Sequence, residues 1–442
     1  MITHAAVLAT IVSLLFLVTS PLNGVLVTVM LRPLVDASWR STLFGFNCLM
    51  LLGAAVPLLV LPRILRTGPR HFFRMPLSRV GIAYLLTILP GVALLAIETD
   101  VVLTANYFFR LVNGFLGFFM FQFFFHDRER FRKLLFCLLL AGLFPVSVGI
   151  YQSITGKVWE LRITSGGLVR NVGFYHDAFS IRAYCFQTLA AILLSWSYFS
   201  SRRSSRIVLA LYGILCCFVA FRVYSKASII LLVVWIILWS VMSRRILWVL
   251  VVPLAVVMVN YSAKGTLFTE TRAVFSKEIL AYEGDLPSEH VLAGRPFIWK
   301  HSWRQWKEGS LVTKLFGGRT AGAPHNDFLR ILIVHGVFGL TVYVSLLAII
   351  GWKLCQKVLS QRTPLAVIGV MIFAGWLVDS MGLVPTMYPA YQWYALGFFG
   401  LTLRGVTGLE RKPLRRERVR NASRPRWPTY YRPGTVPKPF VP

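Results

Sequence analysis

Residues 128–153 read RERFRKLLFCLLLAGLFPVSVGIYQS, a short basic segment that runs directly into 20 residues without a charge. About 20 apolar residues are what an α-helix needs to cross a hydrocarbon core of about 30 Å. Arg128, Arg130, Arg132 and Lys133 lie at the start of the run, and such cations are typical of the cytoplasmic end of a membrane span. The segment therefore predicts a transmembrane helix together with its orientation.

The same pattern recurs along the whole chain. Of its 442 residues, 56% are hydrophobic and 14% are charged, and the mean hydropathy is +0.65. These values exclude a soluble globular protein of this length. We predict an all-α fold, a polytopic transmembrane helical bundle of about twelve spans. The expected spans are residues 5–29, 43–65, 80–97, 107–125, 134–153, 178–199, 207–221, 227–242, 246–261, 339–352, 364–383 and 388–403.

The formal net charge of +30 is distributed between the spans. Alternate connections between the spans are short and basic, namely residues 66–79, 128–133, 202–206, 244–245 and 353–362. The largest cluster of basic residues follows Leu403. The positive-inside rule assigns these connections, and both termini, to the cytoplasm. The charge is therefore expected to orient the chain and to contact anionic membrane lipids, and no nucleic-acid partner is predicted.

This topology divides the chain into five regions. They are N-terminal transmembrane helices (1–153), central transmembrane helices with periplasmic turns (154–261), a long periplasmic loop with interfacial helices (262–338), C-terminal transmembrane helices (339–404) and a basic cytoplasmic tail that we expect to be disordered (405–442). The long loop is the most polar part outside the tail. Chemistry is therefore expected there.

Basic residues on the predicted periplasmic side need a separate explanation, because insertion does not require them there. Guanidinium groups bind phosphate and pyrophosphate through a planar fork of donors. The alternative for each cation is that it reaches the interface separately. Asp379 lies late in an apolar span and is expected to pair with an arginine. The expected pyrophosphate ligands are Arg170, Arg222, Lys226, Arg295 and Arg319.

An ordered set of motifs runs through the long loop. Residues 294–299 (GRPFIW) begin a predicted interfacial helix that ends near Lys307, residues 317–319 (GGR) form a glycine turn, and residues 325–329 (HNDFL) precede a GxxG at 336–339. This order resembles the O-antigen ligase and O-antigen polymerase superfamily, bacterial integral-membrane glycosyltransferases.

Two upstream segments are similar to that family as well. They are residues 170–174 (RNVGF) and 225–228 (SKAS), the second departing from the family's usual Ser-Arg because Lys226 follows Ser225. A lysine keeps the charge but loses the bidentate geometry of arginine. The resemblance covers the chain from about Lys157 to the last span, whereas the first four spans match only in hydropathy.

The resemblance implies transfer of a glycan from a polyprenyl-pyrophosphate carrier to an acceptor sugar hydroxyl. The reaction is expected at the periplasmic face of the bacterial inner membrane. A ligase would use lipid A core as the acceptor and a polymerase would use another glycan, and the sequence leaves both open. There are two alternatives: a non-catalytic scaffold, and a transporter or flippase of lipid-linked glycans. For a transporter we would expect charges near the membrane midplane and broken helices in paired halves of the chain.

The residue chemistry favours transfer. His325 is the candidate general base, because an attacking hydroxyl must lose its proton, and Asn326 or Asp327 is expected to orient its ring. The sequence has no Asp-x-Asp pair for a divalent metal, so arginines, with Arg295 first, are expected to stabilise the leaving pyrophosphate without metal or cofactor. A lone interfacial histidine is more often structural. A second candidate acid–base pair is His176 and Asp177.

Overall fold

The computed structural model describes residues 2–66, 69–244, 247–262, 264–287, 291–322 and 324–409. In this part of the chain nine helices are long and apolar enough to cross a membrane, or ten if α11 and α12 form one broken span. These are the helices of a multi-pass membrane protein, so the predicted all-α polytopic class is confirmed. The count of about twelve spans stays a prediction. Of the predicted basic tail (405–442), residues 410–442 lie outside the part of the chain that the structure describes.

The elements follow one another with short connections, apart from residues 156–177 and the region between α10 and α16. One strand pair is antiparallel, β1 (Thr42–Leu43) with β2 (Phe46–Asn47). The helices are α1 (Ile2–Thr19), α2 (Pro21–Ala37), α3 (Cys48–Arg66), α4 (Pro69–Phe73), α5 (Ser78–Glu98), α6 (Val101–Phe124), α7 (Arg128–Thr155), α8 (Ala178–Tyr198), α9 (Arg203–Arg222), α10 (Lys226–Met242), α11 (Leu247–Ser262), α12 (Thr266–Val274), α13 (Ser276–Glu283), α14 (Val291–Lys307), α15 (Leu311–Phe316), α16 (Asp327–Gln361), α17 (Pro364–Gly382), the 3-10 turn η2 (Pro385–Met387) and α18 (Pro389–Arg404).

The first predicted span, residues 5–29, is wrong as a single helix. The chain leaves helical geometry at Ser20, whose backbone is extended (φ −145°, ψ 95°), and Pro21 opens α2. Proline lacks the N–H that a continuing helix would need, but it suits the first turn of a new one. A Cβ at Gly24 would lie 2.5 Å from the Leu17 backbone, so α2 can pack closely against α1.

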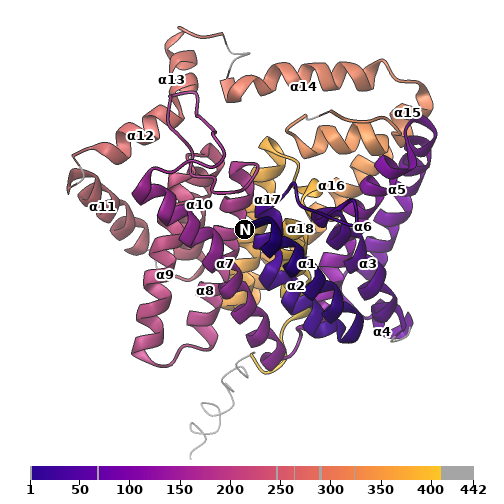
Figure 1. The fold of residues 1–442 in the computed structure, drawn as a ribbon, viewed down its shortest axis with the longest axis horizontal. Helices are drawn as coiled ribbons and strands as arrows, with labels where there is room; N and C mark the ends of the chain where they lie inside the picture. Colours follow the sequence, from indigo (N-terminus) through magenta and orange to yellow (C-terminus); the bar gives the residue numbers. More distant parts are fainter. Residues whose placement is uncertain are drawn as a thin grey trace, which may run out of the picture.

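Different elements lie at the two ends of the bundle. In Figure 1, α4 and the α8–α9 connection lie at the lower end, whereas α12 to α15 lie across the upper end. The predicted loop 262–338 is thus mostly helical, and the helix predicted to begin near residue 294 is present as α14, whereas its interfacial position stays a prediction. Because the connections alternate between the ends, the upper end also holds the end of α17 and the starts of α6, α8 and α18. We use "upper end" for this side below.

Among the nine helices that are long enough to cross a membrane, α8 and α17 are the most buried. A buried ion pair joins them, from Arg182 Nη2 to the Asp379 carboxylate, with side chains only 1% and 3% exposed. The prediction that Asp379 partners an arginine is confirmed. Burying both charges is tolerable because each neutralises the other.

The glycine turn 317–319 packs against a kink in α16. Gly336 has φ 64° and ψ −170°, which interrupts the helix. A Cβ there would lie 2.3 Å from the carbonyl carbon of Leu315, and one on Gly317 would lie 2.2 Å from the carbonyl oxygen of Val334. Gly318 N also donates to that Val334 oxygen at 3.0 Å. These glycines therefore bring α15 against α16.

Replacing Gly336 by alanine is expected to lower the free energy of unfolding by about 3 kcal/mol, because the side chain meets both a left-handed φ and the backbone of α15. Gly213→Ala is the matched control, since its Cβ would make only ordinary contacts at 3.9–4.0 Å inside α9. Unfolding of the two purified variants in detergent measures the difference. Equal stabilities would show that the kink does not constrain α16.

Candidate functional site

His325 lies at the upper end, directly before α16. Its backbone has φ 47°, a left-handed value that costs a non-glycine residue about 1 kcal/mol. The next residue, Asn326, caps α16 by accepting from Leu329 N at 3.1 Å. The side chain of His325 is half-buried. The start of α16 therefore fixes the position of the candidate base.

Asp327 does not orient the His325 ring, contrary to one of the two sequence-based expectations. It is fully buried, and its two carboxylate oxygens accept hydrogen bonds, one from Thr386 Oγ1 and the other from Tyr343 Oη at 2.8 Å. Arg330 Nη1 donates to the same Thr386 hydroxyl at 3.0 Å. The side-chain oxygen of Asn326 is likewise engaged by its cap. Asp327 therefore anchors the start of α16 in the bundle and faces away from the predicted site.

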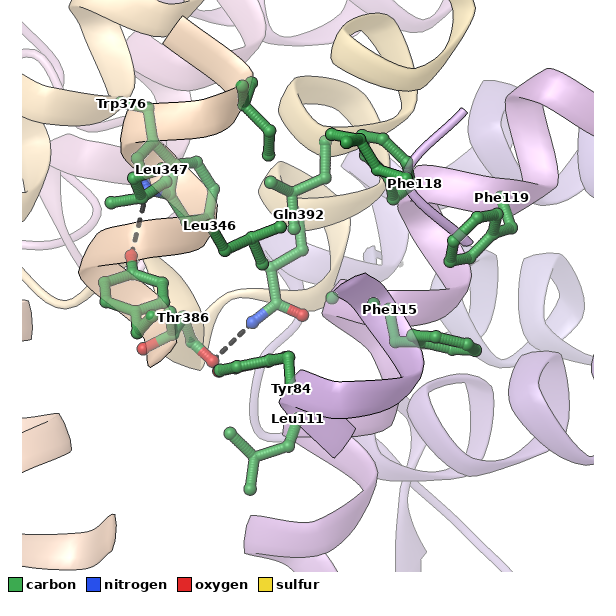
Figure 2. A pocket seen from close by; sticks show the side chains of 16 residues that line it. Tyr84, Leu111, Phe115, Phe118, Phe119, Leu346, Leu347, Trp376, Thr386 and Gln392 are labelled. Atoms are coloured by element: carbon green, nitrogen blue, oxygen red, sulfur yellow. Dashed lines mark hydrogen bonds between the residues drawn. The ribbon is translucent and has the colours of Figure 1, made fainter. Parts of the chain in front are cut away.

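The network extends into a small cavity that Figure 2 shows from close by. There Trp376 Nε1 donates to Tyr343 Oη at 3.1 Å, and Gln392 donates to the backbone carbonyl of Thr386. The cavity has a volume of about 50 Å³ and mainly leucine and phenylalanine walls. Pockets for organic ligands usually have about 300–1,000 Å³. This cavity is too small for a sugar.

Arg295 extends from α14 to the end of α17. Its Nη1 lies 2.8 Å from where a Cβ on Gly382 would be, so a side chain at that position would require the guanidinium to shift. Burial lowers the pKa of Arg295, and the charges of Arg170 and Arg182 lower it further. Three arginines from separate parts of the chain therefore lie close together. We call Arg170, Arg182 and Arg295 the arginine cluster.

His325 adjoins this cluster. Burial lowers the pKa of its imidazole below the usual 6.5, and the positive charge of Arg295 lowers it further. A histidine with a lowered pKa is neutral at neutral pH and can accept a proton. The structure thus brings together three predicted site residues, His325, Arg295 and Arg170.

The cluster has unused hydrogen-bond donors. Arg170 Nε and Arg182 Nη1 are buried and have no partner among the described residues. Asp379 occupies only one nitrogen of Arg182. Since a buried donor without a partner is costly, the arrangement favours an anion with several acceptor oxygens.

Arg222 and Lys226, two other predicted pyrophosphate ligands, are already paired. Arg222 Nη1 lies 2.9 Å from Glu270 on α12, and Lys226 Nζ lies 2.5 Å from Glu278 on α13. Glu278 also accepts from Leu292 N at 2.9 Å, just inside α14. These two cations therefore hold the helices α12, α13 and α14 against the α9–α10 turn.

Arg319 lies apart from the cluster as well. Its Nη1 donates to the backbone carbonyl of Gln305 at 3.1 Å. Gln305 is ten residues beyond Arg295 on α14, which corresponds to about 15 Å along a helix. The arginine of the glycine turn therefore stabilises the far end of α14.

His176 and Asp177 lie near a second, larger cavity and share no side-chain hydrogen bond in the described chain. Asp177 caps α8 by accepting from Ser180 N at 3.0 Å, and it accepts from Tyr388 Oη at 2.9 Å. His176 packs on Trp39 with ring centroids 4.4 Å apart. Asp177 is thus a helix cap, and the expected acid–base pair does not form between these two side chains.

The described residues offer no cluster of metal ligands, and three residues near the site were not predicted. Across the described ranges, no group of three or more His, Cys, Asp or Glu side chains could hold a metal ion, so metal independence stays a prediction. Sequence reasoning missed Gly382, Glu270 and Glu278. The two glutamates carried a signal, because they are rare acids in a strongly basic chain.

Comparisons with known proteins add no relative. A scan against models of protein families found no match, and a search of curated proteins found none either. The family resemblance therefore rests on the short motifs in residues 170–174, 225–228 and 294–339.

Glu278→Gln is expected to loosen the attachment of α13 by about 1 kcal/mol, seen as roughly fivefold faster hydrogen exchange of its amides. Burial opposes ionisation of Glu278, but the hydrogen bonds from Lys226 and Leu292 N outweigh it and lower its pKa. The attachment should therefore be complete above the unfolded-state value of about 4.3 and be lost as the pH falls through the lower folded-state pKa.

The matched control is Glu283→Gln, which changes an exposed acid at the end of the same helix. It should leave the exchange rate of α13 unchanged. If both variants exchange alike, the Lys226–Glu278 pair does not hold this region.

Proposed function

We propose that the protein is a metal-independent membrane glycosyltransferase. It would move a glycan from a polyprenyl-pyrophosphate carrier to an acceptor sugar hydroxyl, as O-antigen ligases and polymerases do. The observation that carries the proposal is the adjacency of a neutral histidine and three arginines at one end of a membrane bundle. The motif resemblance supports the same reaction class.

In this proposal His325 acts as the general base. Its lowered pKa keeps a ring nitrogen unprotonated at neutral pH. That nitrogen takes the proton of the acceptor hydroxyl while the hydroxyl oxygen bonds to the anomeric carbon of the donor. The bond between this carbon and the pyrophosphate oxygen breaks, and its electron pair leaves with the pyrophosphate.

The arginine cluster would stabilise that leaving group. Arg295 and Arg170 are positioned beside Arg182, and the unpartnered donors of Arg170 and Arg182 match the many acceptor oxygens of a pyrophosphate. Because the cluster is half-buried to buried, these charges act with little screening by water. No role in this step is assigned to Arg222, Lys226 or Arg319, since each has a partner elsewhere.

The side of the membrane follows from the charge distribution. The basic connections at the lower end would be cytoplasmic, so the upper end with His325 would face the periplasm of the bacterial inner membrane. Lipid A core and a second glycan both remain acceptors of this proposal. Transport of the lipid-linked glycan would need no general base, so one experiment separates transport from transfer.

His325→Ala is expected to reduce glycan transfer by about 10²–10⁴-fold, the usual contribution of a general base. The measurement is product formation by the purified protein in lipid with a polyprenyl-pyrophosphate-linked glycan and an acceptor. His301→Ala, on the exposed face of α14, is the control and should retain activity. Equal rates for His325→Ala and the parent would refute the assignment, and inhibition by EDTA would refute metal independence.

The acid limb of the pH–rate profile is expected below pH 6.5, because the base must be unprotonated and its pKa is lowered. Arg295→Gln removes the nearby charge and should move the limb to higher pH. Arg295→Lys should keep the limb low while reducing the rate, since lysine retains the charge and loses the bidentate fork. A limb that is the same in all three proteins would contradict the coupling of Arg295 to His325.

A further inference from the structure

A cavity of about 620 Å³ opens at the upper end, and none of its lining residues belongs to the arginine cluster or is His325. It lies between the end of α2, the start of α3, the first turns of α6, and the starts of α8 and α18. Its volume is within the range of pockets for organic ligands. It is a second candidate site, whose lining is separate from the residues assigned to transfer.

The acids of this cavity are already satisfied. Asp36 accepts from Arg32 Nε at 2.6 Å and from Tyr184 Oη at 2.5 Å. Asp177 accepts from the start of its own helix and from Tyr388, as described above. Each carboxylate oxygen therefore has a donor, and neither acid needs a cation from a ligand.

The arginines of the cavity, in contrast, retain free donors. Arg32 is 4% exposed, and its Nη1 is buried without a partner in the described chain. Arg110 Nη1 contacts Met387 Sδ at 3.4 Å, and a thioether is a weak acceptor. These donors therefore favour an anion that accepts hydrogen bonds.

The cavity also has an apolar wall. This wall is formed by Leu49 and Met50 from α3 and by Val102 and Phe109 from α6, whereas the basic lining is Arg32 from α2 and Arg110, which lies on α6 itself. Val102 is 68% exposed, so this wall continues onto the outer, apolar surface of the bundle. A ligand that fits both walls has an acidic group and a hydrocarbon part.

We propose that this cavity binds an amphiphile with a phosphate-type acidic group, held by Arg32 and Arg110 and packed against α3 and α6. This inference rests on the proposed function, because it makes the cavity the site of the second, acceptor substrate. The two basic sites would then bind two lipid-linked anions at the same end of the bundle. Such an arrangement keeps the donor pyrophosphate apart from the acceptor's acidic group.

Binding is tested with the full-length protein in uncharged maltoside micelles. Phosphatidylglycerol and phosphatidylcholine are added separately, and bound lipid is counted by native mass spectrometry. We expect preferential binding of phosphatidylglycerol, weakened about tenfold by Arg110→Gln, since one charge-assisted hydrogen-bonding group is lost. Arg304→Gln, the same change on an exposed side chain at the upper end, should bind as the parent does.

Other outcomes decide against the proposal. Equal binding of the two lipids, or equal binding to the parent and Arg110→Gln, would overturn it. Full displacement of phosphatidylglycerol by millimolar inorganic phosphate would show a free-phosphate site instead of an amphiphile site. If Arg110→Gln does not fold, Ala105→Trp fills the cavity from α6 without changing the charge and should likewise reduce phosphatidylglycerol binding.

The role as an acceptor site is tested by steady-state transfer. Arg110→Gln should raise the acceptor KM about tenfold and leave the donor KM unchanged. If the parent transfers no glycan but binds phosphatidylglycerol through Arg110, the proposed function fails and the binding site stands. If transfer occurs but neither lipid binding nor acceptor KM depends on Arg110, this inference fails and the proposed function stands.

Discussion

The buried ion pair between Arg182 on α8 and Asp379 on α17 is the interaction on which the upper end depends. Removing one partner from such a pair typically costs about 3–5 kcal/mol, because the other charge stays buried. The pair fixes the central helices beside two site elements. Asp177 caps α8 five residues before Arg182, and Gly382, three residues after Asp379, receives Arg295.

Charge is divided between two tasks at this end of the molecule. Two of the acids, Glu270 on α12 and Glu278 on α13, pair with Arg222 and Lys226 and so attach these covering helices at the edge. The arginine cluster at the centre keeps unpartnered donors. Glu270 and Glu278 therefore stabilise the covering helices, while Asp379 pairs with one nitrogen of Arg182 and leaves other donors of the cluster without a partner in the described chain.

Two basic sites on one end of a bundle suit a reaction between two anionic substrates. Tyr388 belongs to the larger cavity, where it donates a hydrogen bond to Asp177 at 2.9 Å. The two sites are thus separate in their lining.

The sequence by itself determined the helical membrane class, because hydropathy is a local property, and it predicted that Asp379 pairs with an arginine, because a buried charge needs a partner. It also predicted a site that contains His325, Arg295 and Arg170, whereas the identity of Arg182 as the partner of Asp379 came from the packing of α8 on α17. The predicted span 5–29 was wrong because hydropathy does not detect a helix break, although Pro21 in the sequence is a signal for one. Only the tertiary structure decided that Arg222, Lys226 and Arg319 are engaged elsewhere and that Asp327 faces inward. Their partners lie 14 to 59 residues away in the chain, and contacts over such separations depend on how the helices pack.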